Sequence, residues 1–286
     1  MIGYFFVAVA LVYIIVAAMF DIKTKEVPDW LSFSLIAIGV FSNLLYSLVI
    51  NEWSFIIYSL TGLVAFLIFG TIMYYTGQWG GGDAKLLVGI GSLLPQYPKI
   101  LLNHFNPSLN MPFLLIIIIN ILLVGGIYGI LYSIFAAIKN RKSFLKEARL
   151  LLKEYNKKLI FSLVILLLIA IFAVLINLYI VVLFIAVILF MMSIFFFIKA
   201  VENASMYKLV QVNKLVEGDW VVQSIRAKNK TIYKPRLLGI SKQDIQDFKK
   251  NNIKQVLVKD GLAFVPVFLM GFLISLIWGN IFLFIF

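Results

Sequence analysis

Long apolar runs are the strongest constraint on what this chain can fold into. A helix needs about 20 mostly apolar residues to cross a bilayer, and 63% of the 286 residues are hydrophobic. We expect a polytopic α-helical membrane protein with about eight transmembrane helices, at 2–20, 31–50, 54–76, 80–102, 112–138, 159–176, 179–198 and 262–285. The first run is read as a helix rather than a removed signal peptide, because no basic residue precedes it.

Two stretches are too polar to lie in a membrane. Residues 139–158 predict a basic amphipathic segment on the membrane surface. Residues 199–261 predict a small α+β insert before the last helix, in which Ser241 and Asp244 form an N-cap. The expected organisation is a membrane core at 1–138, the cytoplasmic amphipathic segment at 139–158, a transmembrane hairpin at 159–198, the cytoplasmic α+β domain at 199–261 and a final transmembrane helix at 262–286.

The basic residues predict the topology, because short flanking loops rich in Lys and Arg stay cytoplasmic. Together with Lys85, the segments 21–30, 139–158 and 199–261 contain 24 of the 25 basic residues, leaving only Lys99 for the other face. We therefore expect both termini to be extracytoplasmic, in the cell membrane. The net charge of +12 is expected to meet anionic membrane lipids, and no nucleic-acid partner is implied.

The residue inventory limits the chemistry to carboxylates, hydroxyls and lysines. The chain has no cysteine and one histidine, so no metal or other cofactor is expected. Asp21 ends the first apolar run, and Asp83 follows a glycine run at the start of the fourth. Because an ionisable group at the border of a bilayer is costly, two at a similar depth indicate a functional pair. In aspartic proteolysis one ionised carboxylate activates water while its protonated partner polarises the scissile carbonyl.

Each aspartate also has a structural interpretation. Asp83 would serve as the N-cap of the fourth helix, with the preceding glycines allowing close helix packing. Asp21 would pair with Lys23 or Lys25 at the interface. If the catalytic interpretation holds, the glycines instead let a substrate backbone approach. Glu26 and Asp29 are expected only to be solvated loop residues.

Several segments together resemble the type IV prepilin peptidases, which are GxGD intramembrane aspartyl proteases, and most closely their archaeal preflagellin and prepilin peptidase branch. The stretch from Asp21 to Asp29, with its Val-Pro-Asp ending, resembles the first catalytic motif, and Gly80–Lys85 resembles G-x-G-D-x-K. Residues 264–269 are similar to a proline-containing segment near the family's active site. Residues 215–220 are similar to the archaeal branch.

The resemblance implies a site and a substrate. The catalytic residues would be Asp21 and Asp83, supported by Gly80, Gly81, Gly82, Lys85, Pro28 and Pro266. The substrate would be the N-terminal basic leader of a pilin- or archaellin-like precursor protein, cleaved at the cytoplasmic membrane face. The chain lacks the cysteine-bearing cytoplasmic loop of bacterial relatives, so N-methylation of the new terminus is not expected.

Two other classes of protein fit the composition. A presenilin-like intramembrane protease of other substrates would not be expected to carry the Val-Pro-Asp loop or the basic insert. A non-enzymatic transporter with membrane carboxylates would more often show internal repeats or a polar pathway through several helices.

Overall fold

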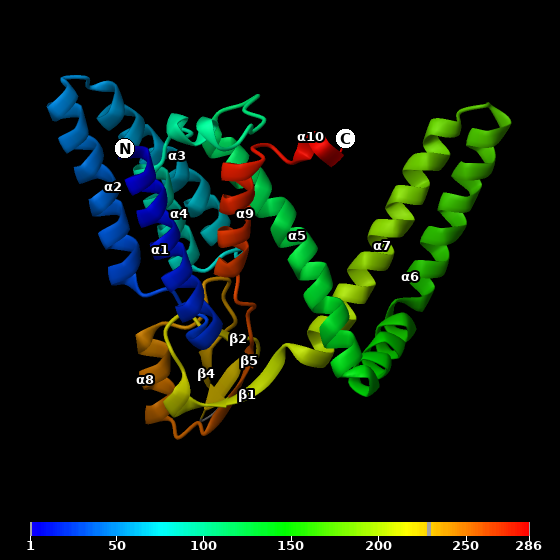
Figure 1. Ribbon diagram of the computed structural model, residues 1–286. Coiled ribbons are helices and arrows are strands. Elements are labelled where there is room, and N and C mark those ends of the chain that lie inside the picture. Colours follow the sequence, from blue (N-terminus) through cyan, green and yellow to red (C-terminus); the bar gives the residue numbers. More distant parts are fainter. Residues whose placement is uncertain (1, 228–229, 286) are drawn as a thin grey trace. The chain divides into compact units, whose positions relative to one another are not determined.

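The computed structural model describes residues 2–227 and 230–285, and most of them are helical (Figure 1). The helices are α1 (Ile2–Thr24), α2 (Asp29–Ile50), α3 (Ser54–Tyr75), α4 (Gly81–Leu93), the 3-10 helix η1 (Lys99–Asn103), α5 (Phe113–Lys139), α6 (Arg141–Leu175), α7 (Tyr179–Ser205), the 3-10 helix η2 (Val212–Lys214), α8 (Lys242–Lys250), α9 (Val265–Ile277) and α10 (Phe282–Ile285). The strands are β1 (Tyr207–Gln211), β2 (Trp220–Val221), β3 (Ile225–Ala227), β4 (Lys230–Tyr233) and β5 (Gln255–Lys259).

Among the described residues, six helices are long and apolar enough to cross a membrane: α1, α2, α3, α5, α6 and α7. Two further apolar helices, α4 and α9, have 13 residues each. At 1.5 Å per residue such a helix is about 20 Å long, against a hydrocarbon core of about 30 Å. The chain is a multi-pass membrane protein, but eight full spans are not confirmed.

Helix-ending residues explain why α4 and α9 are short. α4 ends at Leu93, just before Pro95, which lacks an N–H and disfavours helical backbone at the preceding residue. α9 ends near Gly279, whose φ of +74° suits glycine. The runs at 80–102 and 262–285 therefore each hold a short helix followed by turns and a shorter helical segment, η1 in one and α10 in the other.

No break in the helix separates the predicted segments 139–158 and 159–176. Both belong to α6, one helix of 35 residues, because the sequence from Arg141 to Leu175 contains no glycine or proline to interrupt it. The apolar face of the basic part is only partly covered. Phe144 contacts Phe197 of α7 edge-on, with ring centroids 5.6 Å apart, whereas Leu145 is exposed.

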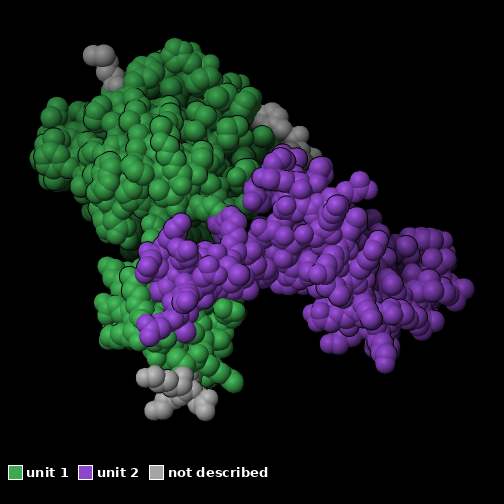
Figure 2. Space-filling model, turned by 90° about the horizontal axis from the view of Figure 1, so that it is seen from below, with its two compact units in different colours: residues 1–129, 216–251, 261–286 green, residues 130–215, 252–260 purple. Residues whose placement is uncertain are grey.

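The chain forms two compact units (Figure 2): residues 1–129, 216–251 and 261–286 form the first, and residues 130–215 and 252–260 the second. The second unit contains the α6–α7 hairpin and an antiparallel pair of strands in which β1 lies beside β5. In the first unit, β3 pairs with β4, and Phe248 of α8 packs edge-on against Tyr233 of β4. The expected Ser241–Asp244 capping box is confirmed at the start of α8.

Within the first unit, glycines let α4 lie directly against α2 and α3. A Cβ at Gly62 of α3 would overlap the carbonyl oxygen of Gly91, and a Cβ at Gly89 would lie 2.7 Å from the Leu35 side chain. Polar side chains then satisfy the carbonyls at the end of α4. The Asn43 amide donates to the Leu93 carbonyl at 3.3 Å, and hydroxyl and amide groups of α3 and α2 both reach the Ser92 carbonyl. A helix can end inside an apolar environment only with such partners.

This packing predicts opposite effects for two glycine-to-alanine changes. Gly62→Ala should destabilise the fold by about 1–3 kcal/mol, because the added methyl overlaps backbone of α4. Gly126→Ala on α5 is the matched control: nothing lies within 4 Å of its added Cβ, and alanine favours helix by up to about 1 kcal/mol. Thermal unfolding in detergent should show a lower midpoint for Gly62→Ala only. Equal shifts would contradict the close packing.

Candidate active site

Asp21 lies in the last turn of α1 and is 4% exposed. Its Oδ2 accepts a hydrogen bond of 2.7 Å from the backbone N–H of Val265, the first residue of α9. The Phe264 amide interacts with the same carboxyl group. The first amides of a helix have no partner within the helix and carry its positive dipole end. Asp21 therefore satisfies the N-terminus of a helix that begins 244 positions later in the chain.

Asp83 is the third residue of α4 and is half-buried. Its Oδ2 accepts a hydrogen bond of 3.1 Å from the backbone N–H of Gly80, the residue that caps the helix. The carboxyl group thus stabilises the start of α4, but from the third helical position: the N-cap is Gly80, and not Asp83 as the structural interpretation had it. A carboxyl group held through one oxygen still has a second oxygen for chemistry.

The fold brings the two aspartates together. The negative charge of Asp21 acts electrostatically on Asp83, although 62 positions separate them. The loop after α1 makes this possible by lying against the start of α4. A Cβ at Gly82 would lie 2.9 Å from the Cβ of Val27 and 3.1 Å from its backbone nitrogen.

The three glycines before Asp83 therefore have different surroundings. Gly82 is needed for the close approach of the α1–α2 loop. A Cβ at Gly81 would make only ordinary contact with the Tyr74 ring, at 3.5 Å, and one at Gly80 would meet Asp83 itself at 3.4 Å. Gly80 is exposed, so it is the glycine that a substrate backbone can approach.

The other predicted supporting residues lie around the same loop. Lys85 pairs with Asp29 at 2.6 Å and lies over the Phe33 ring, 5.3 Å from its centroid. The expectation that Asp29 is only solvated is wrong, although an exposed pair of this kind adds at most about 1 kcal/mol. Pro28 is the residue before α2, and Pro266 lies in the first turn of α9, where the missing N–H costs nothing.

Two acidic residues, Glu26 and Asp219, interact near the loop after α1, in a chain that is basic overall. Burial raises the pKa of Glu26 above its usual value, and the negative charge of Asp219 raises it further. Both residues lie outside the membrane-spanning helices. Glu26 is exposed, as expected of a solvated loop residue, and it also experiences the negative charge of Asp219.

Sequence reasoning missed the groups that position the carboxylates. Val265 acts through its backbone, so its side chain gives no signal, but Pro266 marks a helix start and hence a set of unpaired amides. Trp79, which is 5% exposed, was not singled out, although it immediately precedes the glycine run. In the described part of the chain, no group of three or more His, Cys, Asp or Glu residues is placed to hold a metal ion.

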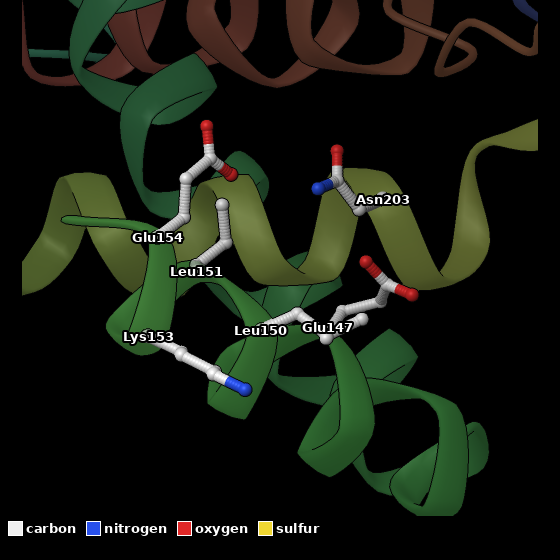
Figure 3. A pocket seen from close by; sticks show the side chains of 6 residues that line it. All are labelled: Glu147, Leu150, Leu151, Lys153, Glu154 and Asn203. Carbon is white, nitrogen blue, oxygen red and sulfur yellow. The ribbon is translucent and has the colours of Figure 1, made fainter. Parts of the chain in front are cut away.

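The second unit has a surface groove, and none of the predicted site residues lines it (Figure 3). Glu154 and Glu147 of α6 lie along it together with Asn203 of α7. Its lining residues are Glu147, Leu150, Leu151, Lys153, Glu154 and Asn203.

The fold and site define a multi-pass membrane protein with two interacting aspartates, each of which accepts a hydrogen bond from the N-terminal backbone of a short helix. Comparison with known families agrees with this class: residues 8–134, which include Asp21 and Asp83, match the type IV leader peptidase family. This is the family that the two aspartate motifs resemble. No solved structure gives a significant match.

Three characterised relatives carry names consistent with that family. The chain is 31% identical over 84 residues to a preflagellin peptidase of Methanocaldococcus jannaschii, covering 29% of this chain and 36% of the relative. It is 28% identical to a preflagellin peptidase of Methanococcus voltae, covering 52% and 62%. It is 29% identical to the prepilin peptidase EppA of Methanothermobacter thermautotrophicus, covering 56% and 43%. The chain thus covers less than two thirds of each of these relatives.

Proposed function

We propose that this protein is a membrane aspartyl endopeptidase that removes the short basic leader peptide from archaellin- or type IV pilin-like precursors. The observation that carries the proposal is the interaction between Asp21 and Asp83, in a segment that matches the type IV leader peptidases. The names of the relatives support the choice of precursor.

The proposed chemistry needs no group beyond the two carboxyls and a water molecule. Because the charge of Asp21 acts on Asp83, we expect the two carboxyls to hold one proton between them and to titrate as a unit. The ionised member removes a proton from water as the water attacks the scissile carbonyl, and the protonated member hydrogen-bonds to the carbonyl oxygen. The amides of Val265 and Gly80 hold the two carboxyls in place, which keeps their geometry ready for attack.

Cleavage is proposed to occur at the cytoplasmic face. The partition of the basic residues supports this orientation, with both termini extracytoplasmic. The proximity of Gly3 to Ile100, at 2.8 Å for an added Cβ, is consistent with it, because the N-terminus then lies on the same side as the single remaining Lys99.

Anionic lipids are proposed as the partners of α6. Its first half presents Lys142, Lys146, Arg149 and Lys153 along one shallow groove, and the same helix is long and apolar enough to enter the membrane. Each basic residue near an anionic surface contributes about 1 kcal/mol of attraction.

The competing classes lack such support. A presenilin-like protease of other substrates shares the aspartate chemistry, but the loop that contacts Gly82 through Val27 is the one that carries the Val-Pro-Asp motif. For a transporter, the aspartates would have to line a polar pathway. Asp21 instead hydrogen-bonds to the end of a helix.

The dyad predicts a loss of activity without a loss of folding. Asp21→Asn and Asp83→Asn should each reduce cleavage by about 10²–10⁴-fold or more, because neither remaining carboxyl can do both tasks. The Asn side-chain oxygen can still accept the Val265 or Gly80 N–H, so the variants should accumulate in the membrane. Purified variants are assayed with a pilin-like precursor by the mobility shift of the processed product.

Glu52→Gln is the control for a lost carboxylate, because Glu52 follows α2 at its other end, where it accepts a hydrogen bond from Ser54. It should process normally. Near-normal processing by either Asp variant would disprove the assignment of the dyad.

The glycine geometry predicts unequal effects for neighbouring substitutions. Gly82→Ala should reduce cleavage by about 10²-fold, because the added methyl pushes the Val27 loop away from α4 and a displacement near 1 Å is enough for such a loss. Gly81→Ala should stay within about threefold of the parent, since the Tyr74 ring lies at ordinary contact distance and alanine favours the helix. Initial rates on the same precursor measure both, and a greater loss for Gly81→Ala would overturn this reading of the glycines.

The orientation predicts which introduced cysteines react from outside the cell. Leu145→Cys on α6 should be protected from impermeant thiol reagents in intact cells, whereas Leu102→Cys in η1 should be labelled. Both positions are exposed, and the chain has no other cysteine. External labelling at position 145 would place α6's basic end outside and remove the argument for cleavage at the cytoplasmic face.

A further inference from the structure

Trp79 connects the two halves of the candidate site. Its indole ring lies between the α3 side, where it meets Phe69 edge-on at 5.6 Å, and the start of α9. On the α9 side it contacts Phe268 edge-on at 5.0 Å and Phe264 at 5.9 Å. We call Phe69, Trp79, Phe264 and Phe268 the aromatic cluster. Trp79 belongs to the buried core.

The residues next to these rings donate the hydrogen bonds that hold the aspartates. Trp79 immediately precedes Gly80, whose N–H binds Asp83. Phe264 immediately precedes Val265, whose N–H binds Asp21. The Trp79–Phe264 contact is therefore a direct side-chain link between the donor of one carboxyl and the donor of the other.

The cluster is also held from outside, so a displacement of Trp79 would not be absorbed by a loose neighbour. A Cβ at Gly125 of α5 would lie 2.8 Å from the Phe264 ring, and one at Gly271 of α9 would lie 2.8 Å from backbone of Ile121. α5 and α9 thus approach closely along this side. Aromatic pairs at these distances also have preferred orientations, which restrict how the rings can shift.

We propose that Trp79 is a positioning residue that sets the separation of Asp21 and Asp83 by joining the glycine turn before α4 to the N-terminus of α9. In this proposal it acts through the two backbone donors and not on the carboxyls themselves. The expected effect on kcat rests on the proposed peptidase function. The expected effect on the distance between the two segments does not.

The kinetic test compares variants on both sides of the ring. Trp79→Leu should lower kcat for a pilin-like precursor by about 10–100-fold and leave KM within about threefold, because the carboxyls are displaced without loss of substrate contacts. Trp79→Phe should restore most of kcat. Phe69→Leu is the matched control, since it removes a ring on the α3 side of Trp79 and leaves the Trp79–Phe264 pair in place, and its kcat should stay near the parent value.

The geometric test does not need activity. Spin labels on Ile22→Cys and Thr76→Cys, both exposed and outside the dyad, report the distance between the end of α1 and the turn before α4 in the purified protein. The parent, Trp79→Phe and Phe69→Leu should give one narrow distance distribution. Trp79→Leu should broaden or lengthen it.

Phe264→Leu breaks the same contact from the α9 side and should reproduce the broadening, so the test remains decisive if Trp79→Leu does not fold. The proposal is overturned if Trp79→Leu and Phe264→Leu keep the narrow distribution, or if Phe69→Leu matches them in both measurements. If no variant and not even the parent cleaves a precursor, the peptidase function fails, while the distance measurement still decides the role of Trp79.

Discussion

The hydrogen bond between the Val265 amide and Asp21 is the contact on which the site depends. A buried carboxyl needs donors, and the first amides of a helix need acceptors, so each end satisfies the other. This pairing draws α9 against α1 although the two helices come from opposite ends of the sequence. Without it, Asp21 would be a buried charge at the edge of a membrane, and the start of α9 would have lost its partner.

Two short helices present their N-termini at the site, although Asp21 itself belongs to the long helix α1. α4 and α9 each present an N-terminus to a carboxyl, and the positive ends of both helix dipoles favour negative charge at that place. Helices of about 20 Å can begin at the dyad and still end among polar caps, such as Asn43 for α4. The glycines of α3 and α4 matter for the same reason, because they allow α4 to approach the side chains that satisfy its last carbonyls.

The errors in the predicted spans have a common cause. Hydropathy reports that a segment is apolar, but a helix ends where the backbone finds other hydrogen-bond partners or a residue such as Pro95 or Gly279 intervenes. Those partners are far away in the chain: Ser108 bonds to the backbone at the end of α9. In α6 the sequence predicted a boundary where the helix continues. A change in composition near residue 158 indicated a boundary, yet nothing in the backbone chemistry interrupts the helix.

The sequence by itself determined the class of protein, the two aspartates and the motifs around them, because apolar runs, a glycine-aspartate turn and a proline after a short loop are local patterns with local causes. Only the tertiary structure decided that the Val265 amide binds Asp21, that Gly82 makes room for Val27, and that Trp79 joins the two donor segments. These contacts are made by backbone groups and by apolar side chains between distant segments, and neither has a signature in a single stretch of sequence.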